Sequence, residues 1–142
     1  MRKRSRRSVS GRLTVRVLLD THIALWAVVG SKRLAPRARD AILGADEVFV
    51  STASIWEIAI KHSLGRDDMP ISSAQALQAF GDAGYALLNI RPEHAVAVER
   101  LAAIHDDPFD RILVAQALEE PLTLITRDAV VASYSAAIMK VA

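Results

Sequence analysis

Four acidic side chains stand at positions along the chain where a catalytic site is commonly built. Asp20 and Asp128 each follow a short apolar run, and Glu57 and Asp110 each lie near the start of an apolar helical pattern. Carboxylates that meet in one place repel and raise each other's pKa, unless a divalent cation neutralises them. A set of ligands made only of oxygen suits Mg²⁺ or Mn²⁺.

Each of these acids also has a structural explanation when it is taken singly. Asp20 and Asp128 are suited to cap the helices that follow them. Glu57 fits a capping box with Ser54 and an i,i+4 pair with Lys61 on a helix surface. Helical periodicity nevertheless places Glu57 at the margin of the buried face. Together, the four acids have no comparable structural explanation.

The segment HDDPFDRILVAQALEE at 105–120 divides its roles between two aspartates. Asp107 followed by Pro108 predicts an N-cap with proline at the first helical position. Asp110 lies on the same side of this helix as Leu113 and Ala117, which are expected to pack on a sheet. A buried carboxylate without a partner is costly. Asp110 therefore needs a cation, a partner or a proton.

Other catalytic chemistries lack their residues in this sequence. There is no cysteine, no phosphate-binding glycine-rich loop and no G-x-S-x-G motif. The histidines have no H-x-x-x-H or H-x-H spacing, which argues against zinc, and we interpret each as a surface or capping residue: His22, His62, His94 and His105. Metal-assisted hydrolysis of a phosphodiester bond remains.

The elements that must position these acids alternate along the chain. Continuous apolar runs predict strands at 15–19, 48–50, 85–90, 122–125 and 137–141. Helical patterns with proline, serine or glycine at their ends predict helices at 23–29, 36–43, 54–64, 73–80, 92–104 and 108–120. Strands that are apolar on both faces and alternate with helices indicate an α/β fold with a parallel sheet of four to five strands.

Composition and charge set the remaining limits. The 142 residues, 51% of them hydrophobic and 24% charged, predict one globular domain at 15–142. No apolar run is long enough for a membrane span, and the lack of cysteine agrees with the cytoplasm. Residues 1–16 hold seven of the 18 basic residues and none of the 16 acidic ones. We expect 1–14 to be a basic, disordered extension, which either contacts nucleic-acid phosphates or has no role.

Four motifs carry a resemblance to a known family. In this order and at these separations, VRVLLDTHIALWAV, VFVSTASIWEIAIKHSLG, HDDPFDRILVAQALEE and LTLITRD resemble the PIN-domain ribonuclease toxins of the VapC type. The resemblance runs from about residue 15 to 134. It implies a Rossmann-like PIN fold and an endoribonuclease that depends on Mg²⁺ or Mn²⁺. It also implies a homodimer that is inhibited by a cognate antitoxin protein.

The resemblance assigns roles to individual residues. It implies that four acids bind the metal and carry catalysis: Asp20, Glu57, Asp110 and Asp128. Asp20 and Asp110 would be the principal ligands, and the Thr126 hydroxyl would lie beside the acids. Asp106 stands where the family pattern has a basic residue, so one positive charge facing a phosphate is expected to be missing.

Cations must frame such a cavity, because acids alone repel RNA. The candidates are Lys61, Arg111 and Arg127, which lie within four residues of the acids and which equally suit an ordinary surface. Trp26 and Trp56 either stack on bases or belong to the core or a dimer interface, and the second role is favoured.

Two other function classes fit the sequence less well. A phospho-receiver signalling module needs paired acids after its first strand, whereas Asp20 stands alone before Thr21. A haloacid-type phosphatase needs D-x-D at the same place. The sequence there is Asp20-Thr21-His22, so this class is excluded as well. The closer alternative is a PIN-type nuclease that acts in RNA processing or on structured DNA, although we expect no additional domain to recognise such substrates.

Overall fold

A computed structural model describes residues 14–141, which contain a sheet of five parallel strands. The strands lie in the order β3-β2-β1-β4-β5. Their bounds are β1 (Arg16–Leu19), β2 (Glu47–Ser51), β3 (Ala86–Leu88), β4 (Thr123–Thr126) and β5 (Met139–Lys140). The predicted fold class is confirmed. The basic extension expected at 1–14 lies almost wholly outside the described residues.

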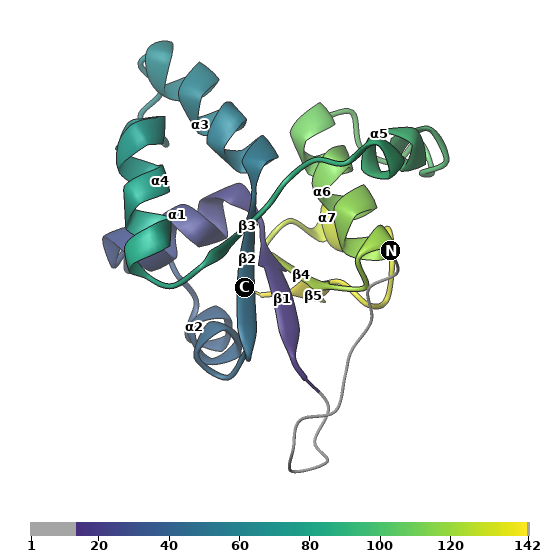
Figure 1. The fold of residues 1–142 in the computed structure, drawn as a ribbon, viewed down its shortest axis with the longest axis horizontal. Helices are drawn as coiled ribbons and strands as arrows, with labels where there is room; N and C mark the ends of the chain where they lie inside the picture. The colour runs from purple at the N-terminus through teal and green to yellow at the C-terminus, as the bar shows by residue number, and fades with distance from the viewer. Residues whose placement is uncertain (1–13, 142) are drawn as a thin grey trace.

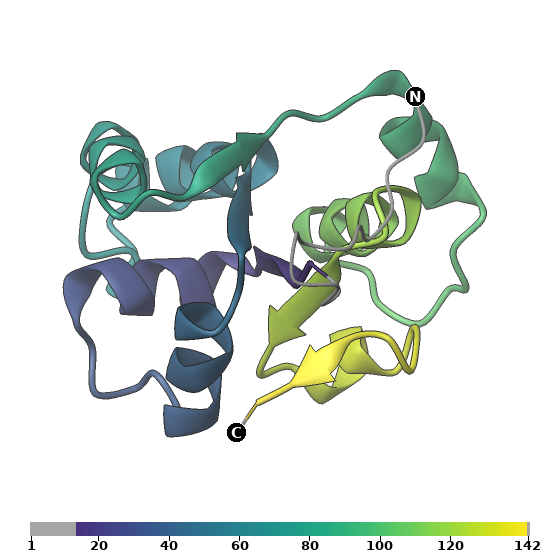
Figure 2. The same cartoon turned by 60° about the horizontal axis from the view of Figure 1, so that its bottom comes forward.

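Helices cover both faces of this sheet. In the described range they are α1 (Thr21–Val29), α2 (Pro36–Leu43), α3 (Thr52–Ser63), α4 (Ser73–Asp82), α5 (Pro92–Glu99), α6 (Pro108–Glu119) and α7 (Ala129–Ala132). Figure 1 shows α1 to α4 on one side of the strands and α5 to α7 on the other. The same separation of α1–α4 from α5 and α6 is visible after rotation (Figure 2). None of the described helices is long and apolar enough to span a membrane.

Strand β1 shows why the apolar runs are continuous. Its Leu18 packs with α6 residues such as Leu113, whereas Leu19 packs with α1 and α3 residues such as Ile23 and Ile58. Neighbouring side chains on a strand point to opposite faces, so a strand covered on both sides is apolar at every position. The sheet therefore separates two apolar layers.

The order of the strands changes direction at β1. The chain proceeds from β1 to β2 and β3 on one side, then returns to place β4 and β5 on the other. Ligand sites in open α/β sheets lie beyond the carboxyl ends of the strands at such a switch point. Here these are the ends of β1 and β4, and the Asp20 N–H donates to the Ile125 carbonyl at 3.1 Å across them.

For two of the predicted helices, the difference in bounds changes an interpretation made from the sequence. The helix predicted at 92–104 ends at Glu99, because the carbonyls of Val98 and Ala102 accept from the Arg111 guanidinium outside the helix. The helix predicted to begin at Ser54 begins at Thr52, after Ser51 as its N-cap. The capping box suggested for Glu57 is therefore wrong.

Candidate active site

A cavity of about 200 Å³ lies at the switch point, beyond the ends of β1 and β4. Five carboxylates and two cationic side chains line it, together with a threonine and a histidine: Asp20, Glu57, Asp107, Asp110, Asp128, Lys61, Arg127, Thr21 and His22. The four acids singled out from the sequence therefore meet in one place.

Asp20 serves both the fold and the cavity. Its Oδ1 accepts from the Ile23 N–H at 3.0 Å, which caps α1, and its Oδ2 accepts from the Thr126 hydroxyl at 2.6 Å. Burial raises the pKa of this carboxyl above its ordinary value, and the bonds from Thr126 and Ile23 oppose the shift only in part. The cap expected from the sequence is present and does not exclude a role in the cavity.

Glu57 lies inside the molecule and not on a helix surface. Its side chain reaches the cavity from α3 and is 4% exposed. The Thr21 hydroxyl donates to Oε1 at 2.6 Å, and Lys61 Nζ donates to Oε2 at 2.6 Å. The i,i+4 pair suggested from the sequence exists, but it orients a buried carboxylate.

Asp110 occupies the first turn of α6 and lines the cavity from there. Burial raises its pKa to about 7, and the carboxylates of Asp107, Glu57 and Asp20 add to the effect while His105 opposes it. A carboxyl in this state holds a proton near neutral pH when no cation is near. Its place on the apolar stripe predicted that Asp110 needs a cation, a partner or a proton, and the raised pKa agrees with that need.

Thr126 is the last residue of β4, and Asp128 follows it as the N-cap of α7. Asp128 Oδ1 caps α7 by accepting from the Val130 N–H at 2.8 Å. The fully buried Thr126 hydroxyl accepts from the Asp128 N–H at 3.0 Å and donates to Asp20. One hydroxyl therefore links the two acids that follow β1 and β4.

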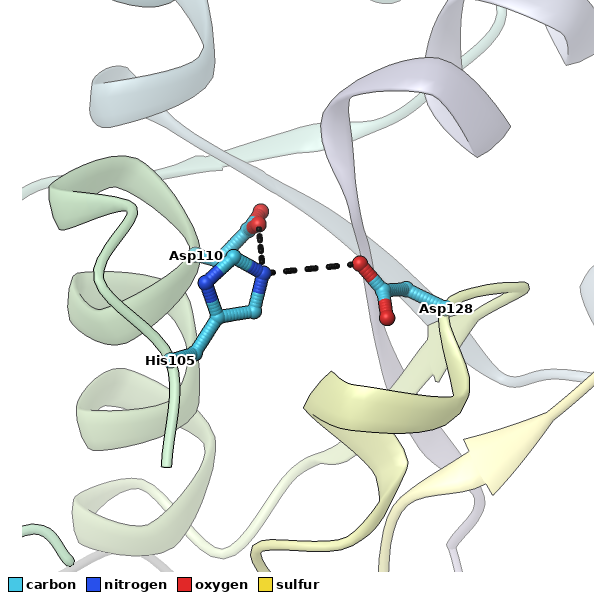
Figure 3. A group of neighbouring side chains, drawn as sticks. All are labelled: His105, Asp110 and Asp128. Atoms are coloured by element: carbon cyan, nitrogen blue, oxygen red, sulfur yellow. Dashed lines mark ion pairs between the residues drawn. The ribbon is translucent and has the colours of Figure 1, made fainter. Parts of the chain in front are cut away.

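His105 belongs to the site, which the sequence did not reveal. Its Nε2 lies 3.0 Å from Asp110 Oδ2 and 3.5 Å from Asp128 Oδ2 (Figure 3). The capping role predicted for it is also present, since Nδ1 accepts from the Asp107 N–H at 3.1 Å. The available signal was its place just before Asp107 and Asp110. His94 is fully buried and is therefore no surface residue, but its Nδ1 accepts from the Arg91 N–H at the start of α5, which is the capping role predicted.

The structure brings only two of the three candidate cationic residues to the cavity. Lys61 and Arg127 line the cavity, and the Arg127 guanidinium lies 4.9 Å from the centre of the Trp26 ring. Lys61 is already paired with Glu57. Trp26 is buried in the core, whereas Trp56 is 60% exposed and packs edge to face on Phe109.

Arg111 points elsewhere. Its guanidinium donates to the carbonyls of Val98, Ala102 and His105 and to the Tyr134 hydroxyl. These bonds hold the connection between α5 and α6. The structure therefore does not bring Arg111 to the cavity.

The donor set fits a hard divalent cation. Five carboxylates face only two cations, and the raised pKa values of Asp20 and Asp110 reflect burial together with charge that the protein leaves without compensation. Oxygen ligands of this kind suit Mg²⁺ or Mn²⁺ better than softer metals.

Known proteins share this sequence pattern and this fold. The family model described as PIN domain matches residues 17–136. The chain is 34% identical over 113 residues to Ribonuclease VapC22 of Mycobacterium tuberculosis, covering 79% of this chain and 86% of that protein.

Two solved structures show the same fold. VapBC2 from Rickettsia felis, bound to a DNA fragment from its promoter, has a TM-score of 0.63 at 12% identity and covers 88% of this chain and 96% of that one. A toxin–antitoxin complex from Klebsiella pneumoniae has a TM-score of 0.60 at 19% identity, covering 87% and 96%. With a matching family model over most of its length and a close VapC relative, the chain belongs to the PIN-domain family, among the VapC-type proteins.

Proposed function

We propose that this protein is a metal-dependent endoribonuclease, the toxin of a toxin–antitoxin pair, which hydrolyses RNA phosphodiester bonds. One observation carries the proposal: four acids from separate elements meet in a cavity at the switch point of the sheet. The similarity to a protein named a ribonuclease supports RNA as the substrate.

Asp20 and Asp110 would be the principal ligands of a Mg²⁺ or Mn²⁺ ion, with Glu57 and Asp128 completing the site. When bound, such an ion lowers the pKa of a water molecule and offsets negative charge on a phosphate. No histidine is required as a general base. The catalytic set proposed from the sequence, including Thr126, is retained.

The protein's own hydroxyls and lysine would fix the acids in place. Thr126 and Thr21 each donate to one carboxylate, Asp20 and Glu57 respectively, at 2.6 Å. Lys61 holds the other oxygen of Glu57. These donors orient the carboxylates before substrate arrives, so less reorganisation is needed in the reaction.

Arg127 is the best candidate for contacting an RNA phosphate. It lines the cavity and no ion pair is found for it among the described residues, whereas Lys61 is engaged by Glu57. The Trp26 ring beneath its guanidinium limits the directions the side chain adopts. Arg111 is instead proposed to support the loop before α6.

A second, apolar cavity of about 290 Å³ favours protein partners. It is lined by residues of α3, α5 and α6 and of the segments beside them: Ala53, Trp56, Ile90, Ala95, Val98, Pro108, Phe109 and Ile112. Exposed apolar surface of this kind marks interaction sites. We propose a second copy of this chain and a cognate antitoxin protein as the partners.

Cleavage of purified total RNA tests the proposed function. The wild type should cut RNA with Mg²⁺ or Mn²⁺ and not with chelator, and Asp20→Asn and Asp110→Asn should be inactive. Asp67→Asn, the same change at an exposed loop residue, is the matched control and should cut normally. Cleavage in chelator would contradict the metal mechanism. Cleavage of structured DNA in place of RNA would favour the alternative PIN-type nuclease.

A further inference from the structure

The loop that carries His105 is held in one place by two side chains. Arg111 donates to the carbonyls of Ala102 and His105 at 3.1 and 3.3 Å and to that of Val98 at 3.0 Å. The Tyr134 hydroxyl accepts from the His105 N–H at 2.9 Å and from Arg111 at 3.1 Å. A loop with this many specific bonds gives the imidazole a defined position.

Local hydrogen bonding also determines where the imidazole carries its proton. Nδ1 of His105 accepts from the Asp107 N–H at 3.1 Å, so this nitrogen has a free lone pair and the proton is on Nε2. Nε2 in turn lies 3.0 Å from Asp110 Oδ2 and 3.5 Å from Asp128 Oδ2 (Figure 3). Nε2 therefore lies close to two carboxylates from separate elements.

Nε2 lies beside one oxygen of each carboxylate. Terminal carboxylate torsions are broad when nothing restrains them. Asp128 already uses Oδ1 to cap α7 at Val130, and His105 faces its Oδ2. Asp110 has Oδ2 beside His105 in the same way. A single imidazole nitrogen thus lies close to two acids that reach the cavity from α6 and from the segment after β4.

We propose that His105 is a positioning residue, which orients Asp110 and Asp128 for the divalent cation and does not itself bind the ion. The inference rests on the proposed function, because it concerns the same cavity. As a ligand, Nε2 would need a lone pair, and the proton would have to move to Nδ1. Nδ1–H would then face the N–H of Asp107, with loss of that hydrogen bond.

Titration calorimetry with Mn²⁺ at one fixed pH tests this assignment. His105→Leu removes the N–H group and should weaken Mn²⁺ binding by about 10- to 100-fold, the usual effect of removing a group that orients metal ligands. His105→Gln places an amide N–H group near the former Nε2 and should stay within about threefold of the wild type, as expected for a donor role. His62→Ala is the matched control, because His62 is exposed on α3 outside the cavity, and its affinity should not change.

Nitrogen NMR of the wild type with Mg²⁺ provides a readout that does not depend on any variant folding. We expect Nε2 of His105 to keep its proton after Mg²⁺ is added. Loss of that proton would make His105 a direct ligand and overturn the assignment. Equal or tighter Mn²⁺ binding by folded His105→Leu would overturn it as well, and the proposed function would stand. If the wild type bound no Mn²⁺, both proposals would fall.

Discussion

Among the places where a histidine lies against a carboxylate in the described part of the molecule, two clusters differ in how completely their charges are matched. In the first, His94 Nε2 lies 2.7 Å from Glu120 Oε2, and both side chains are buried. His94 Nδ1 accepts from the Arg91 N–H at 3.0 Å. In the second, His105 faces Asp110 and Asp128 at the edge of the carboxylate cavity.

This difference in charge matching distinguishes a contact that stabilises the fold from a candidate metal site. The His94–Glu120 pair joins α5 to the end of α6, with one acid for one donor. The carboxylate cavity instead has five acids and two cations. Buried charges are ordinarily paired, so the imbalance supports the proposed cation site. The first cluster should therefore matter for folding and the second for function.

The largest effect is expected when one of the cavity acids loses its charge. Asp110→Asn should reduce RNA cleavage by at least about 10²-fold, because a principal ligand is lost. The raised pKa means that the folded state binds this proton more tightly than the unfolded state, so ionised Asp110 destabilises the metal-free fold above pH 7. The variant should thus be as stable as the wild type or more stable at pH 8, by urea unfolding. A clear loss of stability would make Asp110 a structural residue.

A change in the buried His94–Glu120 pair should lower stability and leave metal binding unchanged. Glu120→Ala leaves the His94 N–H buried without a partner and should lower the free energy of unfolding by about 1–3 kcal/mol. Urea denaturation measures this loss, and calorimetry of the folded variant should give unchanged Mn²⁺ affinity. A variant of normal stability that fails to bind Mn²⁺ would reverse the roles of the two clusters.

Protons should compete with the divalent ion in the carboxylate cavity and not at the His94–Glu120 pair. With the pKa of Asp110 raised to about 7, Mn²⁺ affinity should fall by up to about tenfold for each pH unit below 7, and change little above pH 8. Calorimetry at pH 6, 7 and 8 measures the slope, which Glu120→Ala should leave intact. A slope of zero in the wild type would show that the ion binds without displacing this proton.

The smallest effect is expected at the rim of the cavity. Arg127→Ala should raise the KM for RNA by about three- to tenfold with little change in kcat, because one phosphate contact is lost. Kinetics at several salt concentrations should show a shallower salt dependence than in the wild type. Arg127→Lys keeps the charge and should restore most of the affinity. A change confined to kcat would place Arg127 in the chemistry itself.

Sequence patterns predicted most of the strands and the location of the cavity acids, and both predictions have the same physical reason. Strands buried on both faces read as continuous apolar runs, and the carboxyl end of each run locates one edge of the sheet. The positions of Asp20 and Asp128 at that edge are therefore predictable from the sequence alone. Asp110 could be placed from its position on the apolar stripe of α6.

The remaining features depend on conformations that periodicity does not encode. His105 lies beside Asp110 and Asp128 because the chain leaves α5 at Glu99 and forms a loop, where a continuous helix to residue 104 was predicted. Arg111 turns to carbonyls of the same loop, although it directly follows Asp110 in sequence. Loop geometry set by such distant hydrogen bonds has no local signature.

The most direct test of the central claim is a crystal structure of the protein grown with Mn²⁺, with anomalous scattering recorded at the manganese edge. The proposed site predicts a single dominant anomalous peak in the carboxylate cavity, within ligand distance of Asp20 and Asp110, and no peak beside His94 and Glu120. An empty cavity at saturating Mn²⁺, or a peak only elsewhere on the chain, would contradict it.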